Sequence, residues 1–208
     1  MSVSSIIDVT SAGELRAILG TPQQRVAEKD RPRLHELDRR WLAASPLCLL
    51  ASSNADGRCD ISPKGDPPGF AVVLDDTTIA IPERPGNRRG DTLFNIIGNP
   101  YLGALFLIPG RGDALRLDGR ARIVREAPFF DRMTLRGHRP ALAIVIEIEH
   151  VFYHCARALL RSAVWEEQTW APDAVPPRAV IAKAVERQNE SLADLEEYYG
   201  ERYRDTLY

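Results

Sequence analysis

The sequence contains few of the residues on which metal sites and disulfide frameworks depend. In 208 residues it has four histidines, His35, His138, His150 and His154, and three cysteines, Cys48, Cys59 and Cys155. The cysteines are odd in number and follow no zinc spacing. His150 and His154 have the spacing of a helical ligand pair, but they fall where the pattern predicts a strand. We therefore expect no disulfides and no metal site, and, since Cys48 and Cys59 fall among strand residues, buried thiols.

Long apolar runs and a basic excess are also absent. The longest apolar stretches are strand-sized, and the first residues, MSVSSIIDVTSAGELR, lack the basic start and the apolar run of a signal peptide. The net charge is -2 and the pI is about 6.1, whereas proteins that bind nucleic acid or anionic membranes usually carry a basic excess. We expect a cytoplasmic protein with no nucleic-acid or membrane partner.

The motifs of common nucleotide sites and hydrolases are missing as well. The sequence has neither GxGxxG nor GxxxxGK[ST], the fingerprints of nucleotide sites on parallel sheets. It also lacks a nucleophile elbow for a Ser-His-Asp triad, and Glu147 and Glu149 fall on the solvent side of a predicted strand. No side chain stands out as a required acid or base.

The overall composition is typical of a globular protein, with 44% hydrophobic and 27% charged residues. We predict a single domain over residues 1–208, with a helical extension (1–45), a core (46–165) and a helical tail (171–208). Helices are expected at residues 11–20, 32–44 and 178–199, because their apolar residues recur at helical spacing. Pro32 is expected to start the second of these helices.

The core is predicted to consist of short strands separated by turns. The expected strands are residues 47–53, 58–64, 70–74, 78–81, 102–108, 114–124 and 141–150, with an extension to 154. Pro63 indicates an edge strand or a strand end, Gly119 indicates a bulge, and the apolar run 102–108 indicates a strand buried on both sides. A short helix is expected at 128–135. The pattern favours an antiparallel barrel or sandwich over alternating βαβ units.

Residues 79–100, IAIPERPGNRRGDTLFNIIGNP, are the first candidate for a binding site. A short strand ends at Pro82, an arginine-rich loop follows, and a helix then begins with Asp91 or Thr92 as its cap. Helix N-termini favour anions, and two guanidiniums can bind one anion bidentately. The residues just ahead of this helix are Asn87, Arg88 and Arg89. The stretch therefore suggests a phosphate site.

A solvated loop is the alternative for this stretch. In that interpretation Arg84, Arg88 and Arg89 pair with Glu83 and Asp91 and bind no ligand.

Two further stretches carry polar side chains at regular spacing. In the strand after the first turn, Ser62 and Lys64 share one face and could hydrogen-bond a planar polar ligand; the alternative is a hairpin arm with a surface lysine. Further on, Arg157 and Arg161 are four residues apart, as on one helical face, with Trp165 next. The alternative there is an exposed basic turn anchored by the tryptophan.

Together, four segments resemble the pyridoxamine 5′-phosphate oxidase-like group of FMN-binding split β-barrel proteins. They are CDISPKGDPPGF, IPERPGNRRGDTLFNIIGNP, LRLDGRARIV and HCARALLRSAVW, and the resemblance covers residues 47–165. It is strongest to a bacterial branch of FMN-dependent enzymes. It implies a mainly β protein with an antiparallel split β-barrel of the Greek-key type, N-terminal helices, a helix inserted after the cofactor loop and a C-terminal helix. It also implies FMN at a homodimer interface.

The resemblance implies the cofactor residues as well. The FMN phosphate would lie at the loop before the inserted helix, and the ring would lie along the strand that carries Ser62 and Lys64. The full set is Asp60, Ile61, Ser62, Lys64, Ile81, Pro82, Arg84, Asn87, Arg88, Arg89, Arg116, Arg161 and Trp165. The last three would reach the flavin from the partner chain. Lys64, or secondly Arg161, would be the positive group that stabilises the reduced ring.

The sequence also departs from the family pattern. The family's HCPKA ending is replaced by HCARA, so that Arg157 stands in place of a lysine; His154 and Arg157 are candidate substrate residues. The final YYGERYRDTLY lacks the Arg-x-His motif of true pyridoxamine phosphate oxidases, so we do not expect oxidation of a B6 vitamer.

Three functional hypotheses follow. The first is an FMN-dependent oxidoreductase for a small molecule, with NADH or NADPH as a candidate electron donor. The second is a flavin- or haem-binding carrier or sensor without turnover, and the third is a structural or regulatory domain with an empty pocket.

Overall fold

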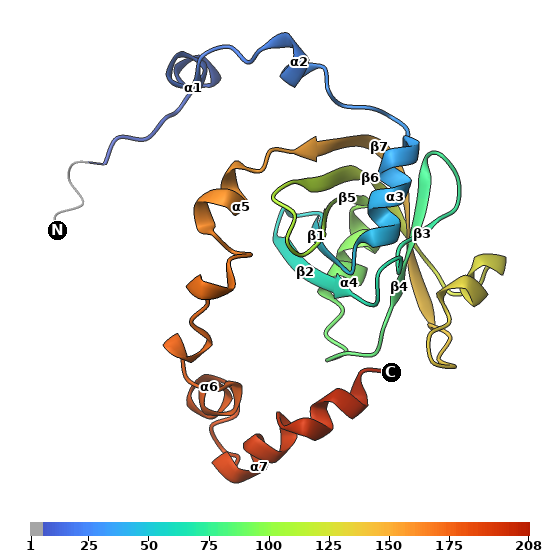
Figure 1. Cartoon of the computed structure of the whole chain (residues 1–208), viewed down its shortest axis with the longest axis vertical. Helices are drawn as coiled ribbons and strands as arrows, with labels where there is room; N and C mark the ends of the chain where they lie inside the picture. Colours follow the sequence, from blue (N-terminus) through green and yellow to red (C-terminus); the bar gives the residue numbers. More distant parts are fainter. Residues whose placement is uncertain (1–5) are drawn as a thin grey trace. The chain divides into compact units, whose positions relative to one another are not determined.

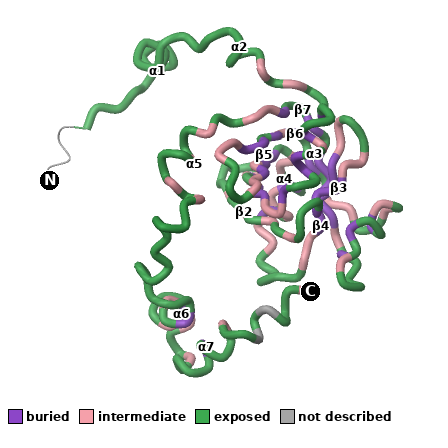
Figure 2. The backbone as a smooth tube through the Cα atoms, in the orientation of Figure 1, coloured by how far each residue is buried: buried purple, intermediate pink, exposed green. Residues whose placement is uncertain are grey.

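The computed structural model describes residues 6–208, except the side chains of Arg202 and Arg204. It divides into one unit that ends at Asp30 and a second that runs from Arg31 to Tyr208. The first unit contains α1 (Ala12–Leu19) and α2 (Gln24–Ala27). Helix α1 is closed by Gly20 as its C-cap, as predicted, and Ser11 caps its start. It has no buried residue, and its apolar face is exposed (Figure 2).

The second unit is built on a seven-stranded antiparallel sheet (Figure 1). Its strand order is β2-β1-β5-β6-β7-β4-β3. The strands are β1 (Leu47–Ser53), β2 (Cys59–Gly65), β3 (Val72–Val73), β4 (Thr78–Glu83), β5 (Tyr101–Leu107), β6 (Ala114–Val124) and β7 (Leu142–His154). The antiparallel, mainly β prediction is thus confirmed, and β2, which carries Pro63, lies at an end of the order as predicted.

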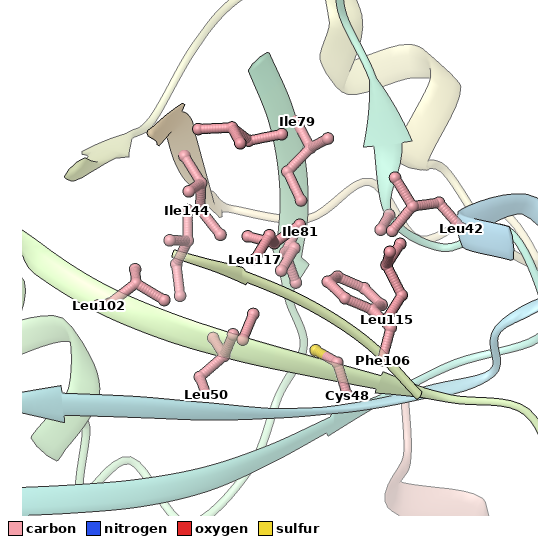
Figure 3. Close-up of a cluster of buried hydrophobic side chains, with 14 of the residues drawn as sticks. Leu42, Cys48, Leu50, Ile79, Ile81, Leu102, Phe106, Leu115, Leu117 and Ile144 are labelled. Carbon is pink, nitrogen blue, oxygen red and sulfur yellow. The ribbon is translucent and has the colours of Figure 1, made fainter. Parts of the chain in front are cut away.

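The sheet curves around a single main core. Ile79 and Ile81 of β4 belong to the same buried cluster as Leu50 of β1 and Phe106 of β5 (Figure 3). Three strands separate β1 from β4 in the strand order, so only strong curvature brings these side chains together. In the described part of the chain, β2 and β3 remain the two free ends of the order, and the sheet is not closed.

Helices α3 (Glu36–Ala44) and α4 (Asp91–Gly98) cover this core. Trp41 and Leu42 of α3 are buried. The prediction that Pro32 starts this helix is wrong, because His35 and Asp38 form a capping box that fixes the start at Glu36. Helix α4 packs on β1, β2 and β6 and buries Ile96, whereas Ile97, predicted on the same apolar face, is 75% exposed.

Two strand predictions are corrected by the structure. Strand β4 does not end at Pro82 but continues to Glu83, paired with β7. Proline is tolerated there because β3 pairs only with Ile79 and Ala80, which leaves that edge of β4 without a partner strand at Pro82. Strand β5 is buried on one side rather than both, since its residues alternate in burial and Tyr101 is 52% exposed.

The remaining helices are short. They are α5 (Arg157–Ser162), α6 (Arg178–Val185) and α7 (Leu192–Tyr198), with 3₁₀ turns at Pro128–Met133, Glu167–Thr169, Pro172–Ala174 and Glu201–Thr206. The single tail helix predicted over 178–199 is wrong, because Ser191 caps a new helix and Ala182 packs against Leu195 in a helical hairpin. No helix among the described residues is long and apolar enough to cross a membrane.

Candidate functional site

A cavity of about 610 Å³ lies where the ends of β2 and β4 approach each other. This volume is within the range of roughly 300–1,000 Å³ that small-molecule and cofactor sites usually have. Its walls come from β2, from the end of β4 and the following loop, and from the C-terminal segment. Its lining includes Ser62, Lys64, Asp66, Pro82, Glu83, Arg84, Asn87, Tyr203, Leu207 and Tyr208.

Strand β2 supplies the polar floor of the cavity. Alternation along the strand places Asp60, Ser62 and Lys64 on one, partly buried face and Ile61 on the other, where it is 69% exposed. The Thr92 hydroxyl of α4 donates to Asp60 Oδ2 at 2.6 Å. Asp60 therefore anchors the start of α4, while the next two polar side chains of the face line the cavity.

Lys64 is not the free surface lysine of the alternative interpretation. Its Nζ lies 2.5 Å from Glu83 Oε2, and the two side chains are only 15% and 25% exposed. This ion pair joins β2 to β4, which are not neighbours in the sheet. Glu83, expected as a partner for the loop arginines, thus has a different cation.

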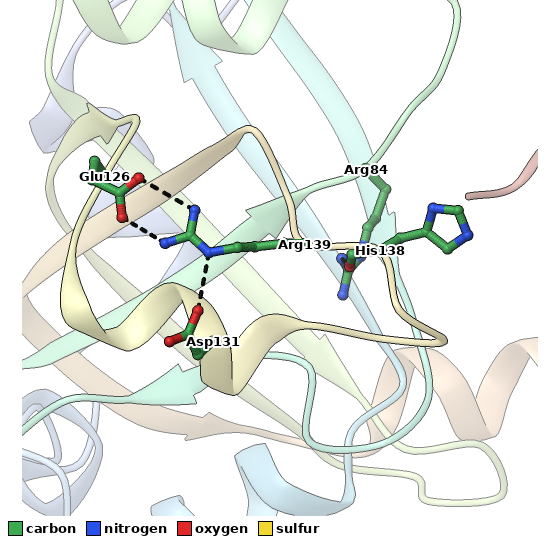
Figure 4. Close-up of polar contacts among 5 residues, drawn as sticks. All are labelled: Arg84, Glu126, Asp131, His138 and Arg139. Atoms are coloured by element: carbon green, nitrogen blue, oxygen red, sulfur yellow. Dashed lines mark hydrogen bonds and ion pairs between the residues drawn. The ribbon is translucent and has the colours of Figure 1, made fainter.

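Arg84 is held by protein groups on all sides. Its Nε donates to Asp66 Oδ2 at 2.6 Å, and the Asp66 side chain is 2% exposed. The other two guanidinium nitrogens donate to the carbonyl oxygens of Met133, at 2.7 Å, and His138, at 3.4 Å. Figure 4 shows Arg84 reaching the backbone at His138, beside the Arg139 ion pairs. Arg84 thus fixes the start of the loop that follows β4, and each of its guanidinium nitrogens already donates a hydrogen bond to a protein oxygen.

The C-terminal segment completes the wall at Tyr208. Its hydroxyl donates to Asp66 Oδ1 at 2.6 Å, and this hydrogen bond raises the pKa of Tyr208. Its ring lies 5.8 Å from the Arg84 guanidinium carbon and 5.4 Å from that of Arg136. Sequence reasoning missed Tyr208 and Asp66, because a contact over 142 positions leaves no local pattern.

The loop before α4 ends in an unusual backbone. Arg88 has φ +61° and Gly90 has φ +68°, and the Asn87 side chain accepts a hydrogen bond from the Arg89 N–H. Gly90 is the N-cap, with no side-chain cap bond, so the prediction that Asp91 or Thr92 caps this helix is wrong. The first-turn N–H groups of α4 are therefore not capped by a side chain, a setting that favours an anion.

The two arginines of this loop differ in their partners. Arg89 forms an exposed ion pair with Asp91, as the solvated-loop alternative expected. For Arg88 no hydrogen bond or ion pair is found among the described residues. Arg88 lines a second cavity on the α4 side of the loop, together with Phe94 and Ile97.

The other predicted site residues do not line the first cavity. Ile81 is fully buried in the core. Arg116 on β6 pairs with Asp118, and Trp165, beyond the end of α5, donates to the Arg111 carbonyl oxygen at 2.8 Å. Arg161 and Arg157 are exposed on α5, and His154 ends β7. Their proposed roles at a partner's site stay predictions.

The described residues form no cluster of metal ligands. Within residues 6–208, no group of three His, Cys, Asp or Glu side chains is placed to hold an ion. His150 and His154 both lie on strand β7, so they are not the one-turn helical pair that their spacing allows.

The sequence profile described as pyridoxamine 5′-phosphate oxidase matches residues 34–155, more than half of the chain. The chain belongs to this family. The match confirms the resemblance seen in the sequence, and it spans all seven strands and α4. Tyr203, Leu207 and Tyr208 lie outside it.

Several solved structures are similar to the chain over a little more than half of its length. HupZ from Group A Streptococcus is 23% identical, with 58% of this chain and 93% of that one covered and a TM-score of 0.48. A Clostridium acetobutylicum protein related to general stress protein 26, of the pyridoxinephosphate oxidase family, is 12% identical (57% and 86% covered, TM-score 0.44). An F420 reductase is 17% identical (54% and 93% covered, TM-score 0.38). None of the curated proteins compared with the sequence matches it.

Proposed function

We propose that the protein is an FMN-dependent oxidoreductase that acts on a small molecule. The observation that carries the proposal is the cavity between β2 and β4, whose lining reaches Asn87 in the loop that leads to the start of α4, where no side chain caps the helix. Membership of the pyridoxamine 5′-phosphate oxidase family supports a flavin as the ligand.

The residues present fit FMN at both of its ends. Arg88, Arg89 and the first N–H groups of α4 form a positive site for the phosphate. Ser62 and Lys64 would hold the polar edge of the ring, and Pro82 and Asn87 would border it. When bound, FMN supplies hydride or electron transfer, while the protein supplies binding, orientation and electrostatics. Tyr203 and Leu207 would exclude water from the same cavity.

Homodimerisation is part of the proposal. Phe94 and Ile97 of α4 are 71% and 75% exposed, and both lie beside Arg88 in the second cavity. Ile61, on the outer face of the edge strand β2, is also mostly exposed. Burying such apolar surfaces against a second copy would bring Arg116, Arg161 and Trp165 of that copy to the flavin.

We further propose the family's split β-barrel of the Greek-key type for the curved sheet. The shared core of β1 and β4 supports it, and so does the Lys64–Glu83 ion pair that links β2 to β4. The expected compartment is the cytoplasm, where the three free cysteines would stay reduced. NADH or NADPH remains the proposed electron donor.

A flavin or haem carrier without turnover is the second candidate. It is favoured by the charges of the cavity wall, because the four charged side chains of its described lining are paired with one another, Lys64 with Glu83 and Arg84 with Asp66. Anaerobic mixing with NADH or NADPH separates the two: bleaching of bound flavin supports the enzyme, and a persistent yellow colour with every donor supports the carrier.

The test of the proposal is flavin binding by the purified protein. We expect the purified protein to show a flavin absorbance spectrum and to release FMN on denaturation. In Arg88→Ala/Arg89→Ala the affinity for FMN is expected to be weaker by about 100-fold or more, because two charge-assisted hydrogen-bond donors are lost. Arg122→Ala is the matched control, because Arg122 is an exposed arginine of β6 outside both cavities. A colourless protein that takes up no added FMN would refute the proposal, and unchanged affinity in the double variant would refute the phosphate site.

A further inference from the structure

Glu83 lies in the cavity wall beside Lys64, and the proposed FMN site gives Glu83 no role. Both residues line the cavity, and both are mostly shielded from water by the surrounding chain. Screening of their charges by solvent is therefore weaker than for surface pairs.

Glu83 is rigidly placed for its contact with Lys64. It pairs with Leu142 in the ladder between β4 and β7, and the next residue, Arg84, is fixed by three hydrogen bonds. Lys64 is held by the ladder between β1 and β2. Two ladders that do not adjoin in the sheet thus fix the backbone positions from which the ammonium and the carboxylate meet.

Lys64 lines the cavity, so a ligand there would feel the field of its charge. The described residues that line the cavity include one other cation, Arg84, whose nitrogens are all bonded to protein oxygens. A carboxylate 2.5 Å from the ammonium offsets most of the positive potential that a ring in the cavity would feel, because the two opposite charges act from nearly the same place.

We infer that Glu83 is a positioning residue that holds Lys64 against β4 and weakens its positive field at the flavin ring. The inference rests on the proposed FMN site. It assigns a function to a residue that the family pattern left aside, and it makes the reduction potential of the bound flavin depend on this ion pair.

The test is a dye-coupled potentiometric titration of FMN-loaded Glu83→Gln beside the wild type. Gln keeps the size of Glu and removes the charge, so the midpoint potential is expected to shift to a more positive value. Glu83→Asp, which keeps the charge, is expected to stay close to the wild type. Glu126→Gln is the matched control and is expected to show no shift, because Glu126 pairs with Arg139 and does not line the cavity (Figure 4).

A second readout needs no flavin. In the apo protein, acylation of Lys64, followed by mass spectrometry with Lys29 as the internal reference, is expected to be faster in Glu83→Gln than in the wild type. An unchanged or more negative potential in Glu83→Gln, or unchanged acylation of Lys64, overturns this inference alone. A wild-type protein that binds no FMN overturns the proposed function together with it.

Discussion

At the scale of single residues, Cys48 shows how burial decides chemistry. Its side chain is fully buried on β1 among apolar neighbours (Figure 3), and this burial raises the pKa of the thiol to about 12. The unfolded chain, in which the thiol has a pKa of about 8.5, releases this proton at a lower pH than the folded protein does. The contribution of Cys48 to the free energy of unfolding is therefore fully present below about pH 8.5 and is lost as the pH rises towards 12.

We expect Cys48 to resist thiol reagents in the native protein. At pH 8, iodoacetamide should modify Cys59 and Cys155, which are exposed, and should reach Cys48 only after unfolding or in strong alkali. Peptide mass mapping before and after denaturation measures this directly. Native labelling of Cys48 at the rate of Cys59 would show that β1 does not bury it.

Single residues also show which parts of the site can be predicted from the sequence and which cannot. Ser62, Lys64, Pro82 and Asn87 were all predicted as site residues, and they line one cavity, because local strand and loop patterns carry that information. The contacts that Lys64 and Tyr208 make in the cavity wall are remote in sequence. Lys64 meets Glu83 over 19 positions and Tyr208 meets Asp66 over 142, and no periodicity encodes such distances.

At the scale of elements, a strand feature was predicted correctly where a single residue type indicates it. Gly119 was predicted as a bulge, and the register of β6 and β7 does shift between Asp118 and Gly119. Helix starts were less predictable, since α3 is set by His35, an uncommon cap, and α4 by Gly90 in a left-handed conformation. The break between α6 and α7 depends on packing of Leu195 that composition alone does not show.

The bulge gives a prediction for the β6–β7 ladder. In Gly119→Ala the new Cβ would lie 2.0 Å from the Glu147 carbonyl oxygen, so the backbone must shift, and the free energy of unfolding should fall by about 2–3 kcal/mol. Gly103→Ala on β5 is the control, because nothing lies within 4 Å of its added Cβ, and we expect a change within about 0.5 kcal/mol. Urea unfolding followed by circular dichroism compares the two; equal stability of both variants would exclude a tight bulge.

At the scale of the whole second unit, two ion pairs connect β2 and its following loop to the last residue of β4 and the residue after it. Lys64–Glu83 and Asp66–Arg84 bridge parts of the sheet that four strands separate in the order. They fix the curvature of the sheet and the walls of the cavity at the same time. Stability and ligand binding are therefore coupled through Asp66, which Arg84 and Tyr208 share.

Arg84→Met tests this coupling. The substitution leaves the almost fully buried Asp66 carboxylate without its cation, and breaking a buried pair in this way costs about 3–5 kcal/mol of unfolding free energy. Arg122→Met removes an arginine from a pair whose side chains are both more than half exposed, and should cost at most about 1 kcal/mol. Urea midpoints at constant m-value measure both losses. If Arg84→Met were no more destabilising than Arg122→Met, the Arg84–Asp66 pair would not hold the ends of β2 and β4 together, and the cavity would need another support.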